Sequence, residues 1–217
     1  MQFITPLFFE FEPIKIANVC ENGSLQLEVS RFIGQYEKQC LIDVLGDCLA
    51  KELADSFQLA EGSFVLKTDA TNAIKNLVNG LEYEATNNGN DVIIYGLIGR
   101  GCSCGCSDST CKKRVWKGIV QNEDYFNGSA MASSKSSFIA DYIHYYHLLV
   151  HRSQTTGTGQ QVLAGENSVT VSNFSKRIDS WNSFVFKVHK LYQFLNDHKT
   201  DYPSWKCNCN LDFKDKY

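Results

Sequence analysis

The fold is decided by one stretch of the sequence, residues 25–57, which reads LQLEVSRFIGQYEKQCLIDVLGDCLAKELADSF. Its apolar residues recur at the i, i+3, i+4, i+7 spacing that aligns side chains along one face of an α-helix. Gly46 and Asp47 interrupt this spacing, so we expect either one kinked helix or two helices that meet there. Asn22-Gly23-Ser24 precedes the stretch and supplies a turn and a helix cap.

Three other segments carry a helical stripe of apolar residues. The first begins near Thr68 or Asp69 and ends around Gly80, the second covers roughly residues 134–152, and the third starts behind Ser172. Amphipathic helices of this length bury their stripes against one another. We therefore predict a mainly α fold built on a bundle of about four long helices.

Residues 91–118 have a different pattern. Val92-Ile93-Ile94-Tyr95 is strand-like, a tip rich in Gly, Cys and Ser follows, and Val115-Trp116 closes the segment. This pattern predicts a small β-hairpin insertion between the second and third helices. Extended N- and C-terminal arms complete the predicted fold.

Length and composition indicate one globular domain. The chain has 217 residues, of which 43% are hydrophobic and 21% charged, and this is enough to bury a core. We treat residues 1–217 as a single helical domain with an N-terminal arm at 1–20, the insertion at 91–118 and a C-terminal tail at 200–217.

The charge balance argues against a general nucleic-acid coat. The net charge is -3 and the pI is near 5.9, whereas a phosphate-binding surface carries a basic excess. The N-terminus does not have the pattern of a signal peptide, and no apolar run approaches the ~20 residues of a membrane span. We expect a soluble protein made in a cytoplasm and no membrane partner.

Nine cysteines stand out in the sequence. Cys20, Cys40 and Cys48 lie in apolar contexts, and we expect them to be buried thiols. The others cluster at the tip of the insertion and in the tail, as Cys102, Cys104, Cys106, Cys111, Cys207 and Cys209. Thiolates at turn tips hold structural zinc, but the CxC spacing differs from the usual CxxC knuckle. Free thiols, a zinc site and disulfides in a mature particle remain open alternatives.

Two groups of polar residues are further candidates. His144, His147 and His151 share one side of the third predicted helix. They either bind zinc there or, as we expect, are half-buried at a subunit contact. The tip of the insertion is basic, with Arg100, Lys112, Lys113, Arg114 and Lys117. It contacts either DNA in a channel or an acidic neighbour, or else it is a solvated turn.

Aromatic residues near both ends are candidates for partner binding, because aromatic anchors concentrate binding energy at interfaces. They are Phe3, Phe8, Phe9 and Phe11 at the N-terminus and Trp205 near the C-terminus. The alternative is that they pack on their own helical bundle. We find no motif of a hydrolase, a nucleotide-binding loop or a catalytic cysteine, and we expect no enzyme activity and no catalytic residue.

The order of several short motifs is similar to a known family. The chain opens with Phe3-Ile4-Thr5-Pro6 and Pro13-Ile14, and its first helix contains Gln35-Tyr36-Glu37-Lys38-Gln39-Cys40-Leu41. Later come Trp116-Lys117-Gly118-Ile119, Tyr142-Ile143-His144-Tyr145-Tyr146-His147, Thr155-Thr156-Gly157-Thr158-Gly159, Glu166-Asn167-Ser168 and Ser180-Trp181-Asn182. This order resembles the head–tail connector, or ring, proteins of Bacteroides-infecting tailed phages, including crAss-like phages.

The resemblance implies a structural virion protein, made in the host cytoplasm, that acts as an adaptor in the neck between portal and tail. Such a protein repeats around the portal axis, commonly as twelve copies, and touches the portal protein, other neck or tail proteins and, through a basic tip, packaged DNA. It implies no cofactor and no catalysis. The cysteines of this chain are denser than the family's pattern implies. A metal site or a redox-active link between cysteines, peculiar to this protein, therefore remains an open alternative.

Two other functions compete with this one. A zinc-stabilised nucleic-acid-binding module would use the cysteine-rich basic tip, with Cys102, Cys104, Cys106 and Cys111 as candidate ligands. A hydrolase would use the histidine face of the third predicted helix.

Overall fold

The computed structural model describes residues 2–11, 13–84, 113–127, 130–150, 154–156, 159–161 and 174–205. Within these ranges the chain is mostly helical, as predicted from the sequence. Its elements are a 3-10 helix, η1 (Pro6–Phe9), and the α-helices α1 (Gly23–Asp55), α2 (Asn72–Asn79), α3 (Phe138–Val150) and α4 (Phe174–Asp197). All β structure in the described residues consists of separate two-stranded antiparallel sheets.

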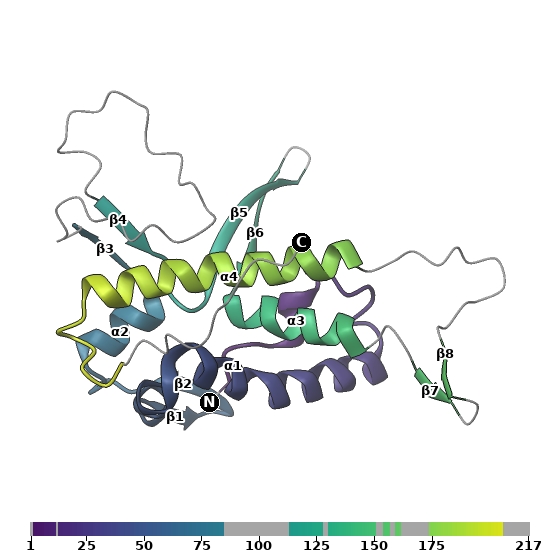
Figure 1. Cartoon of the computed structure of the whole chain (residues 1–217), viewed down its shortest axis with the longest axis horizontal. Helices are drawn as coiled ribbons and strands as arrows, with labels where there is room; N and C mark the ends of the chain where they lie inside the picture. The colour runs from purple at the N-terminus through teal and green to yellow at the C-terminus, as the bar shows by residue number, and fades with distance from the viewer. Residues whose placement is uncertain are drawn as a thin grey trace.

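The strands form four antiparallel pairs. β1 (Phe57–Ala60) pairs with β2 (Ser63–Leu66), and β3 (Leu81–Glu84) pairs with β4 (Lys113–Trp116). β5 (Gln121–Asn127) pairs with β6 (Ala130–Ser136), and β7 (Gln154–Thr156) pairs with β8 (Gly159–Gln161). The β5–β6 unit stands away from the helices (Figure 1).

α1 follows the predicted stripe. The Asn22 Oδ1 atom caps it by accepting hydrogen bonds from the N–H groups of Ser24 and Leu25. Gly46 has φ 78° and ψ 159° inside the helix, a conformation that glycine adopts without strain. The kink expected from the sequence is therefore present, and the two helical parts of α1 meet at an angle there.

α3 is the central element of the core. It packs against both α1 and α4, and it lies between them in the ribbon (Figure 1). Every residue from Phe138 to Tyr145 is buried, so polar side chains on this helix must find partners inside the protein. Ser137 begins α3: its hydroxyl oxygen accepts from the Ile139 N–H at 3.3 Å, and its own O–H donates to the Ile119 carbonyl at 2.7 Å.

A buried ion pair joins α3 to α4. Lys187 Nζ lies 2.7 Å from Asp141 Oδ2, and the two side chains are only 13% and 2% exposed. Ser183 also donates to Asp141, and the Lys187 ammonium donates to Ser136 at 2.6 Å. This network compensates the cost of burying the Asp141 charge.

The β3–β4 unit is locked to α2 by two glycines. Gly80 has φ +95° and Gly118 has φ +92°, and their backbones pass so close that a Cβ on Gly80 would lie 2.5 Å from the Trp116 carbonyl oxygen. A Cβ on Gly118 would collide with the Val78 carbonyl oxygen. The indole N–H of Trp116 donates to the Leu77 carbonyl at 2.9 Å, which fixes β4 to the end of α2.

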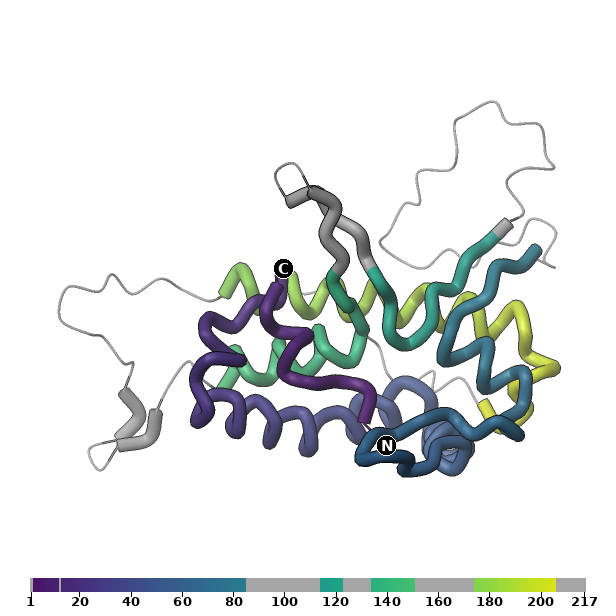
Figure 2. The backbone as a smooth tube through the Cα atoms, turned by 180° about the vertical axis from the view of Figure 1, so that it is seen from behind, coloured from purple at the N-terminus to yellow at the C-terminus, as the bar shows by residue number. Residues whose placement is uncertain are grey.

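The N-terminal segment differs from the arm that we expected outside the helical core. Ile4, Phe8, Phe9, Ile14 and Val19 are all buried, and Figure 2 shows this part of the chain running alongside the helices. The reason is hydrophobic: side chains of this size gain about 1.5–3 kcal/mol each when buried, and η1 turns the segment so that two phenylalanines face inward.

Other boundaries also differ from the prediction. α2 has eight residues and begins at Asn72, because Thr71 rather than Thr68 or Asp69 caps it. α3 begins at Phe138, since the residues before Ser137 pair with β5. The predicted strand at 92–95 lies outside the described residues, whereas β4 lies within the predicted insertion and pairs with residues 81–84.

Replacing Lys187 with Met should lower the free energy of unfolding by about 3–5 kcal/mol, because the buried Asp141 carboxylate loses its cation. The double variant Asp141→Leu/Lys187→Met should lose much less, since no uncompensated charge is left. Urea denaturation followed by circular dichroism measures both. Equal losses in the single and double variants would show that packing, not charge, is what the pair contributes.

Alanine at Gly80 or Gly118 should cost at least about 2 kcal/mol each, because it adds positive-φ strain to a backbone collision. Gly34→Ala is the matched control. Gly34 lies inside α1 with open space around its Cβ position, so alanine there should stabilise the chain by roughly 0.5–1 kcal/mol. Thermal denaturation of the three variants gives the comparison, and a neutral Gly80→Ala would contradict the close crossing.

Candidate functional site

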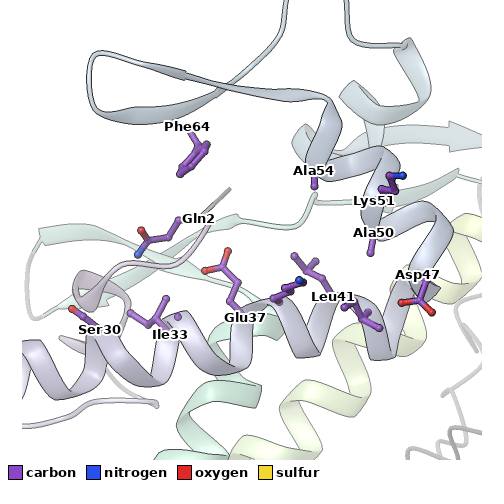
Figure 3. Close-up of a pocket in the computed structure, with 13 residues that line it drawn as sticks. Gln2, Ser30, Ile33, Glu37, Leu41, Asp47, Ala50, Lys51, Ala54 and Phe64 are labelled. Carbon is purple, nitrogen blue, oxygen red and sulfur yellow. The ribbon is translucent and has the colours of Figure 1, made fainter.

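A groove of about 840 Å³ opens along α1. Figure 3 shows its construction: the two parts of α1 on either side of the kink form the floor and one wall, and the β1–β2 hairpin with Phe64 covers it from above. The kink at Gly46 creates this concave shape, because a straight helix would present a convex surface. Thirteen residues line the groove: Gln2, Ser30, Ile33, Gly34, Glu37, Lys38, Leu41, Ile42, Asp47, Ala50, Lys51, Ala54 and Phe64.

Glu37 is the unusual residue of this groove. Its side chain is nearly buried, and a carboxylate oxygen accepts a hydrogen bond from the backbone N–H of Phe3 at 2.5 Å. Burial raises its pKa from 4.5 to about 7, although the N–H groups of Phe3 and Ile4 act in the opposite direction. Glu37 therefore joins the N-terminal segment to α1 with a group that titrates near neutral pH.

The β1–β2 hairpin exposes apolar side chains beside the groove. Leu59 is 67% exposed, Val65 47% and Phe64 43%, and Leu59 is paired with Phe64 across the two strands. Its turn contains Glu61 and Gly62, both with positive φ, which is the geometry of a tight hairpin turn. Exposed apolar side chains gathered in this way are typical of a surface that binds a partner.

The candidate histidines lie inside the protein. His144 is 1% exposed and His147 is 6% exposed, so the expected half-buried subunit contact is wrong for these two residues. His144 Nδ1 is 2.7 Å from the Ser180 hydroxyl of α4, and burial, with a contribution from Lys176, lowers its pKa to about 4. The His147 ring meets the Phe32 ring edge to face. His151 lies outside the described residues.

The histidines are buried because α3 is covered on both sides. A neutral imidazole packs as a small aromatic ring in such a place, and His144 is neutral at physiological pH because its pKa is low. In the described part of the chain, no group of three or more His, Cys, Asp or Glu side chains is arranged to hold a metal ion. The expected absence of a cofactor stays a prediction for the whole chain.

Most of the basic and cysteine-rich tip lies outside the described residues, namely Arg100, Cys102, Cys104, Cys106, Cys111 and Lys112, as do Cys207 and Cys209 in the tail. Lys113 belongs to β4. Arg114 forms an ion pair of 2.8 Å with Asp197 at the end of α4. Cys40 is buried, as expected, and Cys20 is partly buried, but Cys48 is exposed, because the helix turns it away from the core.

The terminal aromatic residues divide into two classes. Phe8, Phe9 and Trp205 are buried in the chain's own core, which is the packing alternative left open by the sequence. Phe3 is partly buried and meets Phe57 edge to face, with ring centroids 5.1 Å apart. Phe11 is 41% exposed, so of these aromatic residues it is the one most accessible to a partner.

Sequence reasoning missed both the groove and the β1–β2 hairpin. The hairpin had a readable signal: Glu61-Gly62 stands between two short runs that carry Leu59, Phe64 and Val65. The groove had none, because it depends on the angle at Gly46 and on where the hairpin folds back.

No protein-family model matches the chain, and no curated protein and no solved structure is similar to it. Among the described helices, none is both long and apolar enough to cross a membrane.

Relative to wild type at the same pH, the Glu37→Gln variant should become increasingly stable as the pH rises from 4.5 through 7. The folded protein holds the Glu37 proton more tightly than the unfolded chain does, so wild type loses stability over this range, by about 1–3 kcal/mol, when the carboxyl ionises. Gln keeps the acceptor for the Phe3 N–H and carries no charge. The measurement is the free energy of unfolding of both proteins from pH 4 to 8; a difference that does not depend on pH would contradict the raised pKa.

Proposed function

We propose that this protein is a structural adaptor of a tailed phage, a subunit that repeats as a ring in the neck between portal and tail. The observation that carries the proposal is the contrast between a helical core in which polar groups of α3 and α4 pair with one another and an apolar hairpin that is exposed beside a groove. A building block needs a rigid interior and surfaces that bind neighbours. We infer the position of this subunit in the virion from the resemblance of its sequence motifs to the head–tail connector proteins.

The core supports a role without catalysis. Several polar groups inside it are engaged with one another: Asp141 with Lys187 and Ser183, and His144 with Ser180. These contacts join α3 to α4 and stabilise the fold, so the groups named here have a structural task. The proposal accordingly includes no cofactor and no reaction.

The finer architecture belongs to the same proposal. In it, α2 joins the three long helices as the fourth member of one bundle, and the cysteine-rich insertion between α2 and α3 reaches a neighbouring layer or the DNA channel. Tyr202 supports the first part, since its hydroxyl donates to the Ala73 carbonyl of α2 at 2.7 Å while its ring packs against Phe194 of α4.

The proposal predicts that the chain is present in purified virions and that a label attached to it lies in the neck. Phe64→Ser should reduce incorporation several-fold while leaving the fold intact, because Phe64 is exposed beside the groove. Phe186→Ser is the matched control: both phenylalanines are 43% exposed, but Phe186 lies on α4 with Lys190 over its ring. Quantitative mass spectrometry of virions measures incorporation, and electron microscopy locates the label. Virions that lack the polypeptide, or an activity that depends on its own side chains, would refute the proposal.

A further inference from the structure

Residues 2–4 form a short strap that lies across α1. The Phe3 N–H donates to a Glu37 carboxylate oxygen at 2.5 Å, and the Ile4 side chain is fully buried. The Gln2 side-chain amide donates to the Ile4 carbonyl at 2.9 Å, so this hydrogen bond lies within the strap and is kept when the strap moves. Gln2 also lines the groove. The strap is therefore one side of the groove.

Glu37 lies where the strap, α1 and the groove meet. Its side chain projects from α1 toward the segment that carries Gln2 (Figure 3), and only 5% of the residue is exposed. A carboxylate in such a place loses most of its hydration. The N–H groups of Phe3 and Ile4 return only part of that stabilisation, because burial outweighs them and raises the pKa of Glu37 to about 7. The closed strap therefore favours the neutral carboxyl group.

The charged groups on the groove side do not reverse this preference. Lys38 and Lys51 line the same groove as Glu37, but both are exposed, as is Asp47, the other acid of the groove. The positive charge of the α-amino group lowers the pKa of Glu37, and its effect is smaller than that of burial. Burial is thus the largest influence on the proton of Glu37.

The other elements near Glu37 bring no cation to it. Strands β1 and β2 contain no charged residue, and the turn between them carries Glu61. Toward the core, the Cys40 thiol is influenced by Glu37 together with Asp43 and Asp141, so the groups on this side are again acids. An ionised Glu37 is therefore stabilised most readily by water.

Water reaches Glu37 most easily when the strap moves. Thr5, between the strap and η1, has extended backbone angles of φ -125° and ψ 163°, so a rotation there frees the strap without changing η1. This motion gives up the edge-to-face contact of Phe3 with Phe57 and the burial of Ile4. Moving Glu37 itself would displace α1 from α3, against which it packs. Opening of the strap is the smaller change.

We propose that residues 2–4 are a pH-controlled strap, closed on α1 when Glu37 is protonated and swung out about Thr5 when Glu37 is ionised, so that the Gln2 side of the groove is uncovered. The closed form holds the Glu37 proton more tightly than the open form, so a rise in pH shifts the equilibrium toward the open form. With a pKa of 4.5 in the open form and about 7 in the closed form, the ratio of open to closed chains rises roughly 70-fold from pH 5 to pH 8. This inference does not depend on the proposed function.

Amide hydrogen exchange of the wild-type chain, followed by NMR, tests the strap. After correction for the pH dependence of the exchange reaction itself, the protection of the Phe3 and Ile4 N–H groups should fall roughly 70-fold between pH 5 and pH 8. At each pH their protection should also be lower than that of the Ile143 and Tyr145 N–H groups, because a buried core helix exchanges only through larger openings of the fold.

Two variants at carboxyl groups of the groove identify the controlling residue. Glu37→Gln keeps an acceptor for the Phe3 N–H but carries no charge, so the protection of the strap should not depend on pH between 5 and 8. Asp47→Asn is the matched control, because Asp47 lines the same groove but is exposed. This variant should keep the pH dependence of wild type. Circular dichroism verifies that both variants fold, and the wild-type series stands without them.

Three results would overturn the inference. The first is protection of the strap in wild type that changes less than about threefold between pH 5 and pH 8. The second is protection of the strap equal to that of α3, since the strap would then open only with the whole fold. The third is loss of the pH dependence in Asp47→Asn as well as in Glu37→Gln, because the general charge of the groove would then control the strap.

Discussion

The burial of α3 on two sides is the constraint on which the rest of the structure depends. A helix placed between α1 and α4 has no solvent-facing side along its first two turns, so each polar side chain there needs an internal partner. Asp141 is paired with Lys187, His144 contacts Ser180, and Tyr142 donates to Asp43 of α1 at 3.1 Å. These contacts set how α1, α3 and α4 meet, and they explain why the histidines pack as core rings.

The same constraint draws both ends of the described chain inward. The helices leave apolar surface uncovered, and η1 with Phe8 and Phe9, together with Tyr202 and Trp205, covers it. Because Glu37 accepts from the Phe3 N–H, the N-terminal segment is joined to α1 through a carboxyl group that ionises near neutral pH. This hydrogen bond therefore helps to hold the segment that contains Gln2, a residue that lines the groove.

The surface features that suit assembly come from short β units rather than from the helices. The β1–β2 hairpin exposes Leu59 and Phe64 beside the groove, and the β5–β6 hairpin projects from the opposite side. A rigid helical interior holds both at a fixed separation. Under the proposed function, this rigidity would keep the angle between neighbouring subunits constant around a ring.

By itself, the sequence determined the helices and their inward faces, because few structures other than an α-helix fit a 3.6-residue apolar period over residues 25–57 and 174–197. It also indicated the break at Gly46. Only the tertiary structure decided which polar and aromatic residues are buried. His144, Phe9 and Trp205 have side chains that suit either a core or an interface, and the neighbours that cover them lie far away in the chain. No local sequence pattern predicts the groove either, because it arises where the kinked α1 meets the β1–β2 hairpin and the N-terminal segment.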